Sequence, residues 1–180
     1  MPMATHNYMT PLLRRNVFAV GLLFAALGTT HAQNILTNGG FEAPIINPTN
    51  TYEYRIGVQL DGWIVSTGNR GVLHFGSGYH PTSAGSQSIQ LETSGDSISQ
   101  SFPTPIGGSY VLEFDLAAYD TSGAQITVTV GDVSTNCVAS SDGTFVRFFV
   151  PFAAVSSKTT LTCRKTGRSP IKSILTSTTW

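Results

Sequence analysis

The sequence has few charged residues and few cysteines. Only 11% of its 180 residues are Asp, Glu, Lys or Arg, and only two are cysteine. Helices in water favour Ala, Leu, Glu and Lys, so the scarcity of charge, beside abundant Gly, Ser and Thr, favours short strands and turns. The two cysteines form no CxxC motif and no paired histidines accompany them, which argues against zinc. Motifs of serine hydrolases, zinc proteases and phosphate-binding loops are absent as well.

The sequence also lacks the strong positive charge that nucleic-acid binding requires. Residues 33–157 contain ten acids and three bases, and five more bases follow from residue 158 onward. An acidic body argues against a nucleic-acid partner. The basic end is typical of a solvated terminus, and contact with an anionic surface is the alternative.

One long apolar run is present, near the N-terminus. Arg14 and Arg15 precede the apolar segment 17–27, and the small residues of 30–32 (Thr-His-Ala) follow it. This order predicts a signal peptide at 1–32, cleaved before Gln33, and an uncleaved N-terminal anchor is the alternative. The run is short for a membrane span. We therefore expect a secreted, extracellular or cell-surface chain with one domain at 33–180 and no membrane span after cleavage.

An exported chain meets an oxidising environment, in which two cysteines can pair. Cys137 and Cys163 both lie in strand-like stretches. A disulfide between neighbouring strands and two free thiols both remain open, because the sequence does not give the distance between the Cα atoms.

Alternation of apolar and polar residues predicts most of the strands. In 108–116 the apolar face carries Tyr110, Leu112, Phe114 and Leu116. The other predicted strands are 61–66, 71–75, 86–92, 96–102, 124–130, 144–152 and 159–163. The stretch 144–152 is apolar on both faces, which predicts a buried central strand.

Turn-forming Gly, Pro, Asp and Ser separate these stretches, and 47–54 and 76–85 are expected to be surface loops. About eight strands at regular spacing predict an all-β fold, a two-sheet antiparallel β-sandwich of the jelly-roll kind.

Several phrases in a fixed order resemble a known family. They are 34–44 (NILTNGGFEAP), 61–63 (DGW), 85–91 (GSQSIQL), 95–102 (GDSISQSF) and 108–117 (GSYVLEFDLA). Together, over about residues 34–161, they resemble the bacterial choice-of-anchor C proteins and their plant cell-wall relatives, the DUF642 family. The resemblance implies a secreted galactose-binding-like jelly roll associated with cell walls or extracellular polysaccharide, with no catalytic activity established for the family.

The end of the chain departs from the family pattern. The family usually closes with a strand that carries an acidic pair, and the corresponding positions here are Lys172 and Ser173. This leaves open whether the closing strand and the basic tail at 164–180 fold as in the family.

The resemblance also implies a structural calcium site. In carbohydrate-binding jelly rolls of this kind, the glutamate that corresponds to Glu42 helps to hold calcium with backbone carbonyls and an aspartate near the C-terminus. Lys172 would repel the metal. The alternative is that Glu42 accepts hydrogen bonds from turn amides.

Aromatic and polar side chains near loops are the candidates for glycan binding, because rings stack on sugars and polar groups bind hydroxyls. The candidates are Trp63, Tyr79, His80, Tyr119 and Asp120. For Trp63 a place in the core is the alternative. Glu113 and Asp115, two positions apart on one strand face, could suggest a glycosidase pair, although outward acids usually serve solubility.

These observations predict a secreted, non-catalytic module that binds carbohydrate, with an extracellular glycan or cell-wall polysaccharide as partner and structural calcium as the one cofactor considered. A structural or surface-matrix protein without a small ligand is the alternative. A carbohydrate-active enzyme is the third hypothesis.

Overall fold

A computed structural model describes residues 34–54, 57–67, 71–78, 80–118, 125–139, 142–167 and 171–174. All of them belong to one compact unit, His31–Trp180. Among these residues no helix is long and apolar enough to cross a membrane.

The described residues form two six-stranded antiparallel sheets. The first sheet has the order β1-β4-β5-β12-β7-β10, with β1 at Thr51–Tyr54, β4 at Val72–Gly76, β5 at Gln87–Leu91, β12 at Ile171–Ile174, β7 at Ser109–Ala118 and β10 at Val146–Ala153. The second has the order β2-β3-β6-β11-β8-β9, with β2 at Gln59–Leu60, β3 at Trp63–Thr67, β6 at Ser97–Pro103, β11 at Lys158–Lys165, β8 at Gln125–Val130 and β9 at Val133–Val138. The all-β sandwich expected from the sequence is confirmed.

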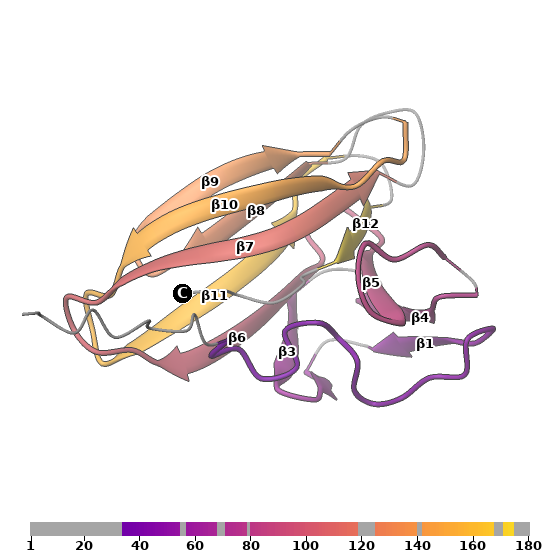
Figure 1. Ribbon diagram of the computed structural model, residues 1–180, viewed down its shortest axis with the longest axis horizontal. Coiled ribbons are helices and arrows are strands. Elements are labelled where there is room, and N and C mark those ends of the chain that lie inside the picture. The colour runs from indigo at the N-terminus through magenta and orange to yellow at the C-terminus, as the bar shows by residue number, and fades with distance from the viewer. Residues whose placement is uncertain are drawn as a thin grey trace, which may run out of the picture. The chain divides into compact units, whose positions relative to one another are not determined.

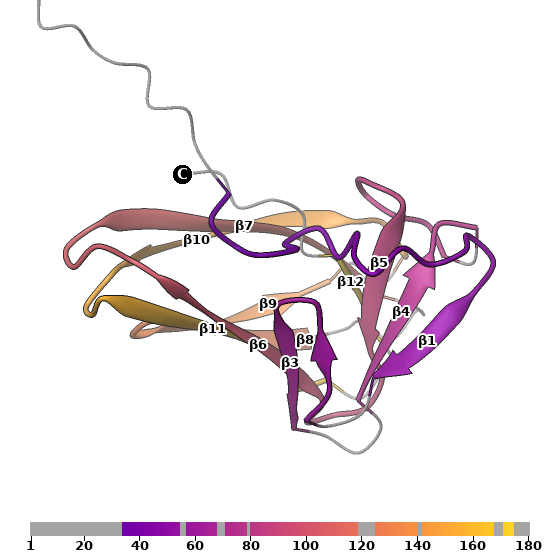
Figure 2. The same cartoon turned by 90° about the horizontal axis from the view of Figure 1, so that it is seen from below.

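The two sheets enclose one hydrophobic core. Figure 2 shows β7 and β10 in one layer and β6 and β11 in the other. Alternate side chains of β7 and β8 point inward, so Phe114 and Leu116 join Ile126 and Val128 in the buried cluster. Each such side chain contributes about 1.5–3 kcal/mol when it leaves water, and these alternating positions therefore hold the layers together.

All eight strands predicted from the sequence are present, with ends shifted by a few residues. Four further strands are β1, β2, β9 and β12. The expected loop at 47–54 is therefore partly wrong, because Thr51–Tyr54 pairs with β4. The closing strand also forms: β12 lies between β5 and β7, and Lys172 is opposite Gln90 on one side and Ala117 on the other.

The prediction that 144–152 is a buried central strand is wrong. β10 pairs with β7 alone and lies at the edge of its sheet, with Phe149 62% exposed and Pro151 also exposed. Proline has no N–H for a ladder hydrogen bond, so within sheets it is confined mainly to edge strands. Pro151 was therefore the sequence signal that contradicted a central position.

Candidate ligand-binding groove

Residues of four of the family phrases form hydrogen bonds with one another. Glu42 Oε1 accepts hydrogen bonds from the backbone N–H groups of Ser86 (2.8 Å) and Gln87 (3.1 Å). The Gln87 side-chain amide donates to the carbonyls of Phe41 (2.8 Å) and Pro44 (3.1 Å). These contacts attach the N-terminal segment to the start of β5.

The side-chain amide of Gln100 likewise attaches the N-terminal segment to the second sheet. Gln100, buried on β6, accepts from Thr37 N–H at 2.8 Å and donates to the carbonyls of Thr37 (2.8 Å) and Gly62 (2.9 Å). We name these contacts of Glu42, Gln87 and Gln100 the N-terminal latch.

Trp63 belongs to the core, which corrects its assignment as a glycan contact. It is fully buried, its ring centroid lies 5.1 Å from that of Phe41, and its Nε1–H donates to the carbonyl of Asn38 at 3.0 Å. Because no face of the indole reaches the surface, it cannot stack on a sugar.

The surroundings of Glu42 do not fit the calcium site that the resemblance implies. Calcium requires six to eight oxygens. Here the carbonyls of Phe41, Ala43 and Pro44 already accept hydrogen bonds from side chains. In the described part of the chain no three His, Cys, Asp or Glu residues gather as a metal site. We therefore derive no role for calcium, and Glu42 has the alternative role of satisfying turn amides.

The other predicted ligand contacts do not form a site among the described residues. His80 is 8% exposed and packs edge-on against Phe75, with ring centroids 4.4 Å apart. Tyr79, Tyr119 and Asp120 lie outside the described residues.

Cys137 and Cys163 are free and buried, so the disulfide alternative is wrong. Cys137 on β9 is opposite Ile126 of β8, and Cys163 on β11 is opposite Val128 of β8. Because β8 separates the two strands, the Cα atoms are at least two strand spacings apart, more than roughly 9–10 Å, and their partners Ile126 and Val128 lie a further two residues apart along β8. A disulfide requires Cα atoms within about 7 Å.

The two acids of β7 are held by one arginine of β10. Arg147 donates from Nε to Asp115 Oδ1 at 2.8 Å and from its terminal nitrogens to Asp115 Oδ2 at 3.0 Å and Glu113 Oε1 at 2.8 Å. The hydrogen bonds and charge of Asp115, with a smaller contribution from Glu113, raise the pKa of Arg147. Both acids of the candidate pair are thus engaged in ion pairs with a neighbouring side chain.

A groove lies between the free edges of the two sheets. It consists of a cavity of about 540 Å³ between β7, β10 and the β8–β9 turn, and a second of about 290 Å³ farther along β9 and β10. Val133 and Pro151 line both cavities, so the two adjoin each other. β9 and β10 are the edge strands of their sheets, and neither has a described strand on its outer side. We call these two adjoining cavities together the edge groove. Figure 1 shows the strands β9 and β10 side by side.

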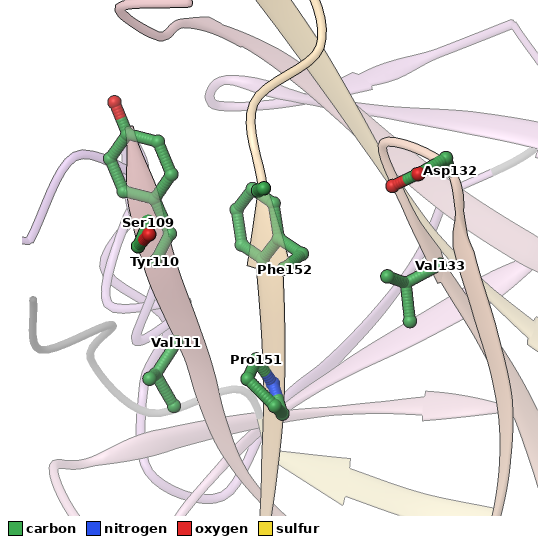
Figure 3. A pocket seen from close by; sticks show the side chains of 8 residues that line it. Ser109, Tyr110, Val111, Asp132, Val133, Pro151 and Phe152 are labelled. Atoms are coloured by element: carbon green, nitrogen blue, oxygen red, sulfur yellow. The ribbon is translucent and has the colours of Figure 1, made fainter. Parts of the chain in front are cut away.

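Aromatic side chains dominate the β10 side of the edge groove. Tyr110 and Phe152 stack with centroids 5.3 Å apart at 23°, and Figure 3 shows them on neighbouring strands, with Val133 across the gap. Phe149 adds an exposed ring in the smaller cavity. A mostly apolar cleft with a few polar groups is typical of small-ligand sites.

The polar groups of the edge groove come mainly from β9 and its turn. Thr135 lines the smaller cavity and Asp132 the larger. Cys137 lines the smaller cavity, and burial raises the pKa of its thiol to about 11, so the thiol is neutral at physiological pH. The Gly131-Asp132 turn between two strands was the sequence signal for this hairpin, and sequence reasoning missed it.

The strand order defines a two-sheet antiparallel β-sandwich of the jelly-roll kind. One solved structure with this fold is TmCBM61 in complex with β-1,4-galactotriose, which is 18% identical over 80% of this chain and 96% of its own, with a TM-score of 0.58. The CBM35 domain of Abf62 from Cellvibrio japonicus is a further similar structure, 12% identical over 56% of this chain and 78% of its own, with a TM-score of 0.48.

Residues 34–172 match the family model described as "Protein of unknown function (DUF642)". The chain therefore belongs to the DUF642 family, as its phrases indicated. A search of curated proteins gave no match.

Proposed function

We propose that the chain is a non-catalytic carbohydrate-binding module and that a glycan lies in the edge groove. The observation that carries the proposal is the pair of adjoining cavities at the edges formed by β9 and β10, with aromatic side chains from β7 and β10 and polar ones from β9 and its turn. An elongated groove suits a linear chain of sugars better than a single compact ligand.

The chemistry of the groove supports a sugar ligand. Pyranose rings have apolar faces that pack on aromatic rings, and Phe149 presents such a ring with 62% of its surface exposed. Sugar hydroxyls need hydrogen-bond partners, which Thr135, Asp132 and the free backbone edges of β9 and β10 can supply. The jelly-roll fold shared with TmCBM61, which was solved with β-1,4-galactotriose, makes a β-linked galactan the first glycan to test.

Two observations favour binding without catalysis. Glycoside hydrolysis generally uses two carboxyl groups on either side of the scissile bond. The described lining of the edge groove supplies one carboxylate, Asp132. The paired acids Glu113 and Asp115 form ion pairs with Arg147 instead.

The proposal predicts that Phe149→Ala weakens glycan binding. Loss of one stacking contact costs about 1.4 kcal/mol, which corresponds to a tenfold rise in Kd. Because Phe149 is exposed, we expect the free energy of unfolding to change by no more than about 0.5 kcal/mol. Isothermal titration with β-1,4-galacto-oligosaccharides, and with a panel of other glycans, measures the effect.

Ile64→Ala is the matched control for this titration. Ile64 is a 45% exposed apolar residue on β3, which lies in the second sheet with β6, β11 and β8 between it and β9. Equal losses in both variants, or wild-type affinity in Phe149→Ala, would place the glycan elsewhere. A complete lack of binding across the panel would favour the structural or matrix role.

We also propose that the chain is exported through residues 1–32 and acts outside the cell or at its surface. The charge and apolar pattern of these residues supports this. The finer resemblance, to the bacterial choice-of-anchor C proteins, is compatible with such a location. An exported protein whose N-terminus is Gln33 would establish the cleavage, and retention of residues 1–32 would argue for an anchor.

A further inference from the structure

We infer that Asp132 makes the edge groove selective for neutral glycans over acidic ones, those with uronate residues. The inference rests on the proposed function, because it names the substrate class of the same groove. It starts from the position of Asp132 at the tip of the β8–β9 hairpin, where the residue is exposed and lines the larger cavity.

Asp132 faces the aromatic part of the groove. Figure 3 shows its carboxylate on the side of the hairpin turned toward Phe152. A sugar that lies in the larger cavity, which Tyr110 also lines, would therefore lie close to the Asp132 carboxylate.

The described lining of the edge groove offers no positive charge to balance Asp132. Neither cavity is lined by a Lys, Arg or His among the described residues. The Cys137 thiol, with its pKa raised to about 11, contributes no charge at neutral pH. Arg147 is on β10 but its guanidinium is paired with Glu113 and Asp115, and this trio carries a net negative charge.

The size of the effect follows from Coulomb's law. Two carboxylates about 5 Å apart repel each other enough to lower affinity about fourfold in the dielectric of bulk water, and more strongly at a protein surface. For a neutral sugar the same carboxylate is favourable, because it accepts hydrogen bonds from hydroxyl groups. Asp132 thus favours a neutral chain and opposes an acidic one.

The test compares one glycan in two charge states. A β-1,4-galacto-oligosaccharide is titrated against the wild type, and so is the same oligosaccharide oxidised at C6 to the uronate. We expect the neutral form to bind at least about fourfold more tightly at low salt. Added salt should reduce this preference, because it screens charges that are exposed to solvent.

Asp132→Asn keeps the size and the hydrogen-bonding capacity of the side chain and removes its charge. We expect the variant to bind the neutral oligosaccharide within about threefold of wild type and the oxidised form several-fold more tightly than wild type does. The control is Asp61→Asn, which removes an exposed acid at the β2–β3 turn. It should leave the ratio of the two affinities unchanged.

The possible failures are distinguishable. If the wild type binds the neutral form and Asp132→Asn leaves the ratio unchanged, the role of Asp132 is wrong while the proposed function stands. Equal affinity of the wild type for both forms leads to the same conclusion. If neither form binds, or if Phe149→Ala binds as wild type does, the proposed use of the edge groove fails first.

Discussion

At the scale of single residues, the polar side chains of the family phrases serve the architecture. Glu42 and Gln87 hold the N-terminal segment against β5, and Gln100 holds it against β6. Each buried amide has hydrogen-bond partners among backbone groups, as burial of polar atoms requires. Four of the phrases supply the residues of the N-terminal latch, and the phrase 108–117 supplies Tyr110 to the lining of the edge groove.

We expect the protonation of His74 to make the stability of the protein depend on pH. It is fully buried on β4, its Nε2 lies 2.7 Å from the Phe41 carbonyl, and its Nδ1 has no hydrogen-bond partner. Burial lowers the pKa of His74, while the Phe41 carbonyl and the charge of Glu42 oppose that shift. The neutral ring, with Nε2 protonated, therefore fits this site.

This arrangement predicts acid destabilisation. The unfolded chain takes up a proton near pH 6.5 and the folded chain only at lower pH, so the free energy of unfolding falls as the pH drops below about 6.5. Thermal melts at about pH 7.5 and pH 5.5 should show a smaller loss of Tm in His74→Gln than in the wild type, because glutamine does not titrate there. An identical loss in both proteins would assign the pH dependence to other groups.

At the scale of elements, alternation found the long strands and missed the short or polar ones. β7 and β8 place every second side chain in the core, which the sequence displays directly. β9 has Ser, Thr and Asn on much of its surface, and β12 gains its place only by pairing with two strands distant in sequence. Their strand character comes from tertiary pairing more than from local pattern.

The position of β12 predicts a strong effect of proline there. Because β12 pairs with β5 on one side and β7 on the other, a proline at Ser173 removes a hydrogen bond in the middle of the first sheet. We expect Ser173→Pro to cost about 2–3 kcal/mol, or about 5–10 °C in Tm. Ser173→Ala, which keeps the N–H, should melt close to wild type in the same calorimetric scan. A proline variant as stable as the alanine variant would contradict the central position of β12.

At the scale of the whole molecule, the edge groove exists because both sheets end on the same side. β10 closes one sheet and β9 the other, and the cleft between them is lined by residues from both. Sequence patterns give strands but not the order of strands in a sheet. The exposed face of Phe149 could therefore not be recognised as part of a groove before the neighbours of β10 were known. Pro151 alone hinted at the edge.

NMR mapping tests most directly whether a glycan binds between β9 and β10. Backbone amide shifts of the isotope-labelled protein are followed while a β-1,4-galacto-oligosaccharide, or the best ligand of the glycan panel, is added. We predict saturable shifts concentrated at Tyr110, Asp132, Thr135 and Phe149, with little change on β3. Shifts concentrated on another face of the sandwich would contradict binding in the edge groove, and so would their absence at concentrations where titration calorimetry detects binding.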